Sequence, residues 1–289
     1  MISKGGLYME FTKMEAAGND FVIFDGFKYD IKNLSELAKK ACHRHFSVGG
    51  DGIMVCKEST SCNIRMIYYN SDGTEGEMCG NGIRCFSKYV FENNFVDKKI
   101  FTVETLAGPK IINLELDEYN KVESVEVNMG KANLNSKSIP VDLNKEIILE
   151  ESLNIDGEEI IFSAALVGVP HVVIFVENIG DIDINFLGKK IENHNIFPRK
   201  TNVNFVEILE RSKINIYTWE RGAGRTLGCG TGSSASVFIG HILNKLDNNV
   251  RVVAEGGEME ITIMENQEIF MKGGANTICK GNLYNIGGM

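Results

Sequence analysis

The sequence predicts an α+β protein of two pseudo-twofold-related domains, each a mostly antiparallel β-sheet or barrel wrapped around one central helix. The length of 289 residues favours about two domains, each long enough to bury a hydrophobic core. Short alternating segments bounded by glycine turns outnumber helical ones, which indicates that sheets dominate. A Cys-Gly-x-Gly motif precedes a helical pattern at Cys79 and again at Cys229, which is 229 − 79 = 150 positions later. This recurrence indicates an internal duplication.

The domain boundaries follow from where these patterns begin and end. We expect the first domain to span residues 9–126 and to be completed by the C-terminal segment 276–289. The second domain is expected to span residues 127–275. Residues 1–8 are expected to form a tail, because a strand pattern begins only at Met9. This stretch has no apolar core of the kind that a signal peptide needs.

The first half contains mainly strands. Strands are expected over residues 11–14, 21–24, 63–69, 101–105 and 110–116. Ser35 could cap a helix over residues 37–42, which has lysines near its end. A second helix is expected directly after Cys79, because Ile83 and Phe86 are spaced as on one helical face.

The second half repeats the order of the first. Strands are expected over residues 214–219, 250–254 and 259–263, with a helix from 231 or 232 to about 243. In both halves the order is strand, polar turn, Cys-Gly-x-Gly, helix, strand, glycine turn, strand. Two like units would therefore each place a cysteine and several glycine amides at the N-terminus of a central helix.

Composition excludes some classes of partner. A net charge of −9, with 43% hydrophobic and 24% charged residues, is that of an ordinary globular protein without attraction for nucleic acid or an anionic membrane. Seven cysteines, with no secretory segment and no Cys-x-x-Cys motif, favour reduced thiols in the cytoplasm and no metal site. His43 and His45 lack a third metal ligand and are expected at a solvated helix end. A homodimer is left open.

The paired motifs predict a specific chemistry. A helix N-terminus with glycine amides favours a thiolate, which is a strong base or nucleophile. Cys79 and Cys229 on opposite sides of a carbon could remove its hydrogen from one face and return it on the other, without a cofactor. The amides of residues 80–81 and 230–231 are suitably placed for the neighbouring carboxylate, which gains charge in the transition state.

The chain resembles the diaminopimelate epimerases, which are cofactor-independent amino-acid epimerases of the two-cysteine type. The resemblance covers nearly the whole chain from Met9. It rests on a series of motifs in order, namely Gly18-Asn19-Asp20-Phe21, Tyr69-Asn70-Ser71-Asp72-Gly73, Cys79-Gly80-Asn81-Gly82-Ile83-Arg84-Cys85, Pro170-His171, Thr201-Asn202-Val203-Asn204-Phe205, Glu220-Arg221-Gly222 and Cys229-Gly230-Thr231-Gly232.

The resemblance implies a role for each matching residue. Cys79 and Cys229 would be the acid/base pair, and His171 and Glu220 would tune the thiols. The carboxylate at the reacting carbon would be bound by Gly80, Asn81, Gly230 and Thr231. The rest of the substrate would be held by Asn19, Asn70, Asn202, Glu220 and Arg221. The implied reaction converts LL-diaminopimelate to the meso form, a step toward lysine and peptidoglycan, with no cofactor and no metal.

Three positions depart from the pattern of the family. Val169 stands where an asparagine commonly precedes Pro-His and helps to grip the distal carboxylate. Gly52 stands where some members have glutamine, and Arg225 where a glutamate often precedes the second cysteine. The first departure removes a hydrogen-bond donor from the group that distinguishes diaminopimelate from simpler amino acids.

Several alternatives remain open at this point. Val169 favours a racemase of another amino acid, such as histidine, with the same mechanism. A hydrolase or transferase would use one cysteine as nucleophile with His171 as base, and a non-catalytic amino-acid-binding protein would need neither thiol. His171 could also be an ordinary core histidine, Asn70 and Asn202 could cap turns, and Glu220 could pair with its neighbour at the surface.

Overall fold

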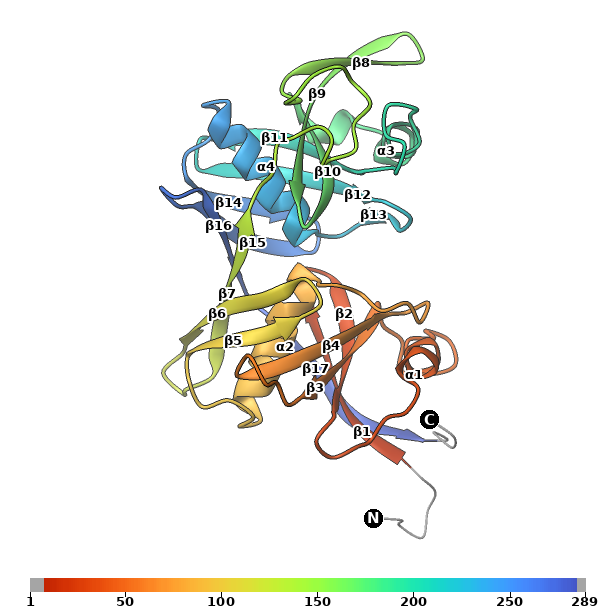
Figure 1. Ribbon diagram of the computed structural model, residues 1–289, viewed down its shortest axis with the longest axis vertical. Helices are drawn as coiled ribbons and strands as arrows, with labels where there is room; N and C mark the ends of the chain where they lie inside the picture. The colour runs from red at the N-terminus through yellow and green to blue at the C-terminus, as the bar shows by residue number, and fades with distance from the viewer. Residues whose placement is uncertain (1–7, 285–289) are drawn as a thin grey trace. The chain divides into compact units, whose positions relative to one another are not determined.

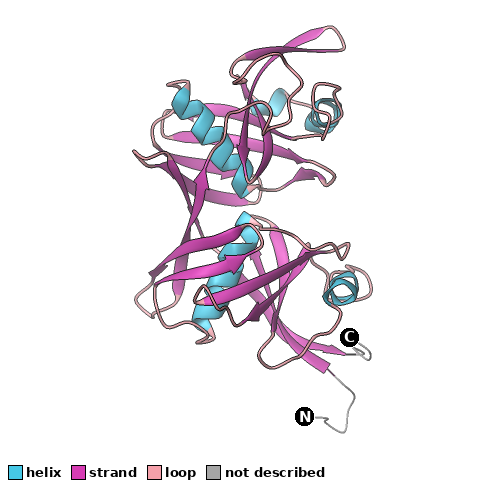
Figure 2. Ribbon diagram, in the orientation of Figure 1, coloured by secondary structure: helices cyan, strands magenta, loops and turns pink. Residues whose placement is uncertain are grey.

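The computed structural model describes residues 8–284 and divides the chain into two compact units. Unit 1 comprises Met1–Val127 and Gly273–Met289, and unit 2 comprises Asn128–Lys272. Residues 1–7 of the expected tail and residues 285–289 lie outside the described part, and Tyr8 is the first residue of a strand. Strands predominate in each unit (Figures 1 and 2).

Unit 1 is a sheet with helices on both faces. Its elements are β1 (Tyr8–Ala16), β2 (Asn19–Asp25), α1 (Leu34–Ala41), β3 (Gly52–Lys57), β4 (Ile64–Asn70), α2 (Gly80–Glu92), β5 (Ile100–Thr105), β6 (Gly108–Leu116), β7 (Val122–Lys131, which continues into unit 2) and β17 (Asn276–Tyr284). The pairs β2–β3 and β4–β5 are parallel, whereas β1–β2, β1–β17, β3–β4, β5–β6 and β6–β7 are antiparallel.

Strand β2 lies between the two helices of unit 1. Successive side chains of a strand point to opposite faces, and four residues in a row, Phe21 to Phe24, are buried. Val22 packs in one hydrophobic cluster with Leu37 of α1. Phe21 lies on the other face, where its ring is 3.4 Å from the position that a Cβ on Gly82 of α2 would take. The sheet therefore holds α2 on the face opposite α1.

Helix α1 begins earlier than the sequence predicted. The expected cap was Ser35, but the helix starts at Leu34 and Asn33 is its N-cap. The Oδ1 of Asn33 accepts a hydrogen bond of 3.1 Å from the backbone N–H of Glu36. Asparagine caps at least as well as serine, and it stands where the extended chain ends, so the prediction for Ser35 was wrong.

Unit 2 repeats this arrangement. Its elements are β8 (Glu151–Ile155), β9 (Glu158–Val167), β10 (Val169–Val176), the 3-10 helix η1 (Ile179–Asp181), α3 (Ile184–Glu192), β11 (Asn202–Glu210), β12 (Lys213–Glu220), β13 (Gly224–Thr226), α4 (Gly230–Ile242), β14 (Asn249–Ala254), β15 (Gly257–Ile263) and β16 (Glu268–Gly273). Here β10–β11 and β12–β14 are the parallel pairs, and β14–β15 is an antiparallel hairpin.

Strand β11 separates the helices of unit 2 as β2 does in unit 1. Val203 and Phe205 pack in one hydrophobic cluster with Ile184 and Ile191 of α3. The alternate residue Asn204 lies on the other face, where its Oδ1 would be only 2.3 Å from a Cβ on Gly232 of α4. Buried polar side chains of β11 therefore lie beneath the first turn of α4.

The two units share one plan. Each has two parallel strand pairs, a short helix on one face, a 13-residue helix on the other and a following hairpin. The 13-residue helices begin at Gly80 and Gly230, at the predicted spacing of 150 positions. The predicted α+β class, with a sheet around a central helix in each half, is confirmed. In the described residues, no helix is long and apolar enough to cross a membrane.

Candidate active site

Cys79 is the N-cap residue of α2. Its backbone is extended, with φ −132° and ψ 123°, and the backbone N–H of Gly82 donates to its Sγ over 3.4 Å. A hydrogen bond from an N–H and the positive end of the helix both stabilise a thiolate more than a thiol. A Cβ at Gly82 would lie 2.1 Å from Cε of Met54 and 3.2 Å from Cβ of Cys79, so a side chain there would have to displace the end of the Met54 side chain.

Asn81 and Asn19 are brought together beside Cys79. The Nδ2 of Asn81, a residue of the first turn of α2, donates to Oδ1 of Asn19 over 2.6 Å. Asn19 begins β2, and its Nδ2 donates to Oδ2 of Asp51 over 3.0 Å. Arg84, one turn further along α2, donates to Oδ1 of Asn81 over 2.6 Å. We call Cys79, Asn81, Asn19, Asp51 and Arg84 together the Cys79 cluster. Neither Asp51 nor Arg84 was predicted from the sequence as a site residue.

The side chain of Asn70 forms hydrogen bonds with residues close to it in the sequence. At the end of β4, its Oδ1 accepts from the hydroxyl of Tyr68 over 2.6 Å, and its Nδ2 donates to Oγ1 of Thr74 over 3.0 Å. These hydrogen bonds match the turn-capping alternative that the sequence also allowed.

Cys229 occupies the equivalent position in unit 2. It is the N-cap residue of α4, with φ −127° and ψ 112°, and only 7% of it is exposed. Its Sγ lies 3.3 Å from Oγ1 of Thr231. Gly232 corresponds to Gly82, and a Cβ there would lie 2.3 Å from Oδ1 of the buried Asn204.

His171 is fully buried on the α4 face of β10, next to β11. Asn204 Nδ2 lies 3.2 Å from His171 Nδ1 and also donates to the carbonyl of Val172 over 3.0 Å. Asn204 Oδ1 accepts from the hydroxyl of Thr218. Because Val172 offers only an acceptor and Thr218 supplies a donor, the amide is oriented with its NH₂ toward His171. His171 Nδ1 is therefore the acceptor and its proton is on Nε2.

Burial keeps His171 neutral. Loss of hydration, reinforced by the positive charge of Arg221, lowers the pKa of His171 from 6.5 to about 3. Its Nε2–H has no hydrogen-bond partner among the described atoms. A neutral imidazole with an unsatisfied N–H is a hydrogen-bond donor, so His171 is not an ordinary satisfied core histidine.

Asn202 and Glu192 fix the turn that carries Glu220 and Arg221. Asn202 donates to the carbonyl of Pro170 over 2.7 Å and accepts from the backbone N–H of Arg221 over 2.9 Å. The buried carboxylate of Glu192 accepts from the backbone N–H of Gly222 over 3.1 Å. We call the set formed by Cys229, Thr231, His171, Asn202 and Asn204 the Cys229 cluster.

Comparisons with known proteins identify the family of this chain. The model of the family described as diaminopimelate epimerase matches residues 11–135 and 163–278. The diaminopimelate epimerase of Alkaliphilus metalliredigens is 47% identical over 94% of this chain and 96% of its own length. That of Carboxydothermus hydrogenoformans is 44% identical over 96% of this chain and 100% of its own. This chain belongs to the diaminopimelate epimerase family.

Solved structures of low sequence identity show the same fold. A hydroxyproline epimerase from Agrobacterium vitis superposes with a TM-score of 0.71 at 14% identity, over 96% of this chain and 91% of that one. A PhzF-family phenazine biosynthesis protein from Bacillus anthracis gives a TM-score of 0.68 at 14% identity, over 96% and 100% of the two chains.

Two of the three departures from the diaminopimelate epimerase pattern have local explanations. A Cβ on Gly52 would lie 2.6 Å from both Cε2 of Tyr68 and the carbonyl of Tyr69, so glutamine has no space there. Arg225 donates to Glu255 through Nη2 over 2.6 Å and stacks on the ring of Tyr217 at 5.0 Å, as a surface contact.

Val169 lies in the tight connection between β9 and β10. Gly168 has φ +71°, a conformation suited to glycine, and Val169 pairs with Val167 across the turn. A Cβ on Gly168 would lie 3.9 Å from Cγ2 of Thr231, which places this turn beside the first turn of α4. The side chain at position 169 is partly buried and apolar, so it offers no hydrogen bond to a substrate.

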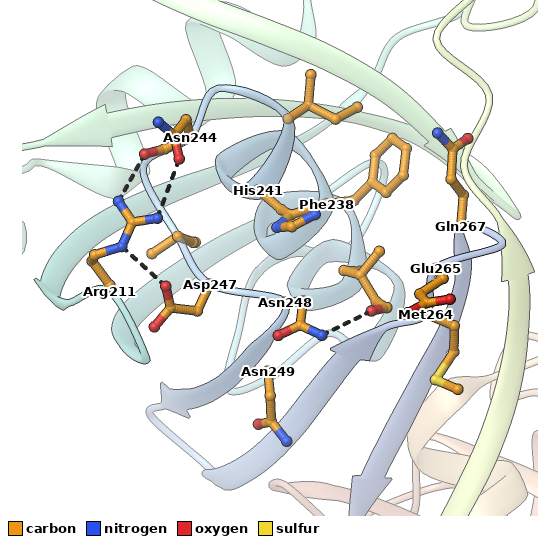
Figure 3. Close-up of a pocket in the computed structure, with 13 residues that line it drawn as sticks. Arg211, Phe238, His241, Asn244, Asp247, Asn248, Asn249, Met264, Glu265 and Gln267 are labelled. Carbon is orange, nitrogen blue, oxygen red and sulfur yellow. Dashed lines mark hydrogen bonds and ion pairs between the residues drawn. The ribbon is translucent and has the colours of Figure 1, made fainter.

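The cavity in Figure 3 is separate from both cysteine clusters. It has a volume of about 860 Å³ and lies around the C-terminal end of α4, where Phe238 and His241 line it. Arg211 is held there by Asp247 and Asn244 through bonds of 2.9 to 3.3 Å. None of the predicted site residues lines this cavity.

Proposed function

We propose that this chain is a cofactor-independent epimerase that converts LL-diaminopimelate to meso-diaminopimelate by proton transfer between two thiols. One observation supports this above the others. Cys79 and Cys229 are the N-cap residues of duplicated 13-residue helices, with the same extended backbone and the same glycine three residues later. Membership of the diaminopimelate epimerase family supports the substrate.

The proposed step conserves protons and electrons. A thiolate takes the proton from the α carbon, so that an S–H bond forms as the C–H bond breaks, and the electron pair spreads into the carboxylate. The other thiol gives its proton to the opposite face, which regenerates a C–H bond of inverted configuration and a thiolate. The amides of Gly80, Asn81, Gly230 and Thr231 would bind the carboxylate while its charge grows.

The neutral state of His171 narrows its proposed role. A group whose pKa is about 3 does not act as a cation that attracts a thiolate near pH 7. We therefore propose that its Nε2–H acts as a neutral donor beside the reacting groups. Asn19, Asn70, Asn202, Glu220 and Arg221 remain the proposed contacts of the rest of the substrate, and the need for reduced thiols favours the cytoplasm.

Exchange of the α hydrogen tests the proposal. Incubation with LL-diaminopimelate in heavy water is expected to give the meso isomer with deuterium at the inverted carbon, measured by NMR and chiral chromatography. Cys79→Ser and Cys229→Ser are each expected to abolish inversion. Cys279→Ser, which changes an exposed thiol of β17, is the matched control and should keep full activity.

A panel of other L-amino acids tests the alternative substrate that Val169 favours. Diaminopimelate is expected to exchange far faster than histidine. Rapid exchange of histidine with inert diaminopimelate would overturn the proposed substrate and retain the two-thiol mechanism. Turnover by a variant that lacks one of the two cysteines would overturn the mechanism itself.

A further inference from the structure

The first turns of α2 contain a buried cation. Arg84 is only 1% exposed, on a helix whose neighbouring residues Ile83 and Phe86 are completely buried. Burial lowers the pKa of its guanidinium. Among the described residues, no carboxylate forms an ion pair with it, and its Nε has no hydrogen-bond partner. A buried charge without a counter-charge is costly, so the burial of Arg84 has to be explained by what its guanidinium binds.

The bonds of Arg84 lead into the Cys79 cluster. Its Nη1 donates to the carbonyl of Gly274 over 3.1 Å, and its Nη2 donates to Oδ1 of Asn81 over 2.6 Å. From Asn81 the hydrogen bonds continue through Asn19 to Asp51. We call these four side chains, Arg84, Asn81, Asn19 and Asp51, the amide relay.

The two ends of the amide relay fix its direction. A guanidinium only donates, so Asn81 must turn its oxygen toward Arg84 and its NH₂ toward Asn19. A carboxylate only accepts, so Asn19 must turn its NH₂ toward Asp51 and its oxygen toward Asn81. Both ends demand the same orientation of both amides. Arg44 holds the far end through a 2.7 Å bond to Oδ1 of Asp51.

The duplicated unit has no such relay. At the offset of 150 positions, Arg84 corresponds to 84 + 150 = 234, which is Ser234, and Asn81 corresponds to Thr231. Ser234 donates to the carbonyl of Gly230 over 2.8 Å, within its own helix. Arg84 is therefore not required by the helix architecture that both units share.

We propose that Arg84 is a positioning residue that, through the side chain of Asn81, orients the side-chain amide of Asn19 for substrate before substrate binds. This inference rests on the proposed function, because the Asn19 side chain is a substrate contact only within it. A preoriented amide avoids the cost of turning and ordering a side chain during binding and reaction. Arg84 itself acts through Asn81 and does not contact the substrate.

Side-chain NMR tests the orientation without any assumption about activity. The NH₂ signals of Asn19 and Asn81 are compared in the full-length protein and in Arg84→Met, Arg84→Lys and Arg44→Met. Arg84→Met is expected to shift the Asn19 signals, although Arg84 does not bond to Asn19, and to speed their exchange with solvent. Arg84→Lys retains a donor-only group and should restore most of the change. Unchanged Asn19 signals in Arg84→Met would overturn the relay, whatever the enzyme does to diaminopimelate.

Kinetics test the consequence for the reaction. Arg84→Met and Asp51→Asn are each expected to lower kcat/KM by about tenfold or more. Each removes one of the two charged groups that orient the side-chain amides of Asn81 and Asn19. The loss in the double variant should differ from the product of the two single losses, since both changes act on the same amides. Multiplicative effects would show independent sites and overturn the proposal.

Two controls separate positioning from folding. Arg44→Met removes the ion pair to Asp51 but leaves a carboxylate at the end of the relay, so kcat/KM should stay near that of the natural chain. Thermal unfolding of every variant shows whether the fold persists. If Arg84→Met unfolds, Asp51→Asn carries the same test, because it should shift the NH₂ signals of Asn81, to which Asp51 does not bond. Failure of inversion in the natural chain would overturn the proposed function while the NMR result still decides the relay.

Discussion

The Cys79 cluster and the Cys229 cluster differ in how the same backbone is stabilised. Both cysteines cap a 13-residue helix, and each lies beside a glycine at which an added Cβ would meet a neighbouring side chain. Around Cys79 the amides are oriented by charged groups, Arg84 and Asp51. Around Cys229 the orienting group is a neutral amide, Asn204, and the buried imidazole that it contacts is neutral too. Duplication has thus retained the helix terminus while the supporting side chains have diverged.

The largest effect is expected when a charge is placed in the Cys229 cluster, where it should change the pKa of His171. Asn204→Asp substitutes a carboxylate for the amide that donates to His171 Nδ1 and to the Val172 carbonyl. An adjacent carboxylate favours the imidazolium, so the pKa of His171 should rise by about 2. Titration of the His171 ring signals by NMR measures this. The natural chain should show no His171 titration between about pH 5 and 8, and Asn204→Leu, which adds no charge, should behave like it.

His171 signals in Asn204→Asp that do not titrate at a higher pH than those of the natural chain would contradict the assignment of Asn204 as the partner of His171 Nδ1. A fall in stability is expected in the same variant, because the carboxylate faces the carbonyl of Val172. Denaturant unfolding separates that cost from the change of pKa.

Alanine substitutions at the equivalent glycines, Gly82 and Gly232, compare the rigidity of the two clusters. In Gly82→Ala the new methyl would meet Cε of Met54, the end of a flexible side chain, which can move aside. In Gly232→Ala it would meet Oδ1 of Asn204, which is buried and held by three partners. Overpacking costs about 1–3 kcal/mol, and Gly232→Ala is expected toward the upper end of that range. Urea unfolding and kcat for both variants give the comparison, and a larger loss in Gly82→Ala would reverse our ranking of rigidity.

These contrasts also show what the sequence could predict. The repeated Cys-Gly-x-Gly and the alternating strands are local patterns, so they placed the central helices and the strands that flank them. The buried polar contacts are not local. Arg84 lies among apolar residues of an amphipathic segment, and nothing in that pattern shows that it reaches Asn81 and Gly274. Asn204 carried one signal, because its spacing of two from Asn202 places both on one face of a strand.

The neutral histidine gives the stability a specific pH dependence. The pKa of His171 is about 3 in the folded chain and 6.5 without perturbation. As pH falls below 6.5, the unfolded chain binds a proton that the folded chain does not, so stability is lost progressively down to about pH 3. Between pH 7 and 5 this loss is about 2 kcal/mol. His171→Gln has no imidazole at this position and therefore lacks this pH dependence. Between pH 7 and 5 the free energy of unfolding should fall by about 2 kcal/mol more in the natural chain than in the variant.

Parallel losses in the natural chain and in His171→Gln over this range would show that folding does not lower the pKa of His171. The Cys229 cluster would then gain a positive charge below about pH 6.5, and the contrast with the Cys79 cluster would disappear. The carboxylates titrate in both proteins and cancel in the difference.

The smallest difference between the two units is expected at the N-caps of their short helices, and it concerns the free energy of unfolding. The short helices α1 and α3 both begin with an Asx cap, in which Asn33 accepts from the N–H of Glu36 and Asp183 accepts from that of Phe186, each over 3.1 Å. Substitution of either cap by alanine should cost about 1 kcal/mol. Asp183→Ala should cost a few tenths more at pH 7, because only the aspartate adds a charge at the positive end of the helix dipole. That excess should vanish at high salt, which screens an exposed charge. Urea unfolding of both variants at low and high salt measures it, and an excess that survives high salt would mean that the difference between the caps lies in packing rather than in charge.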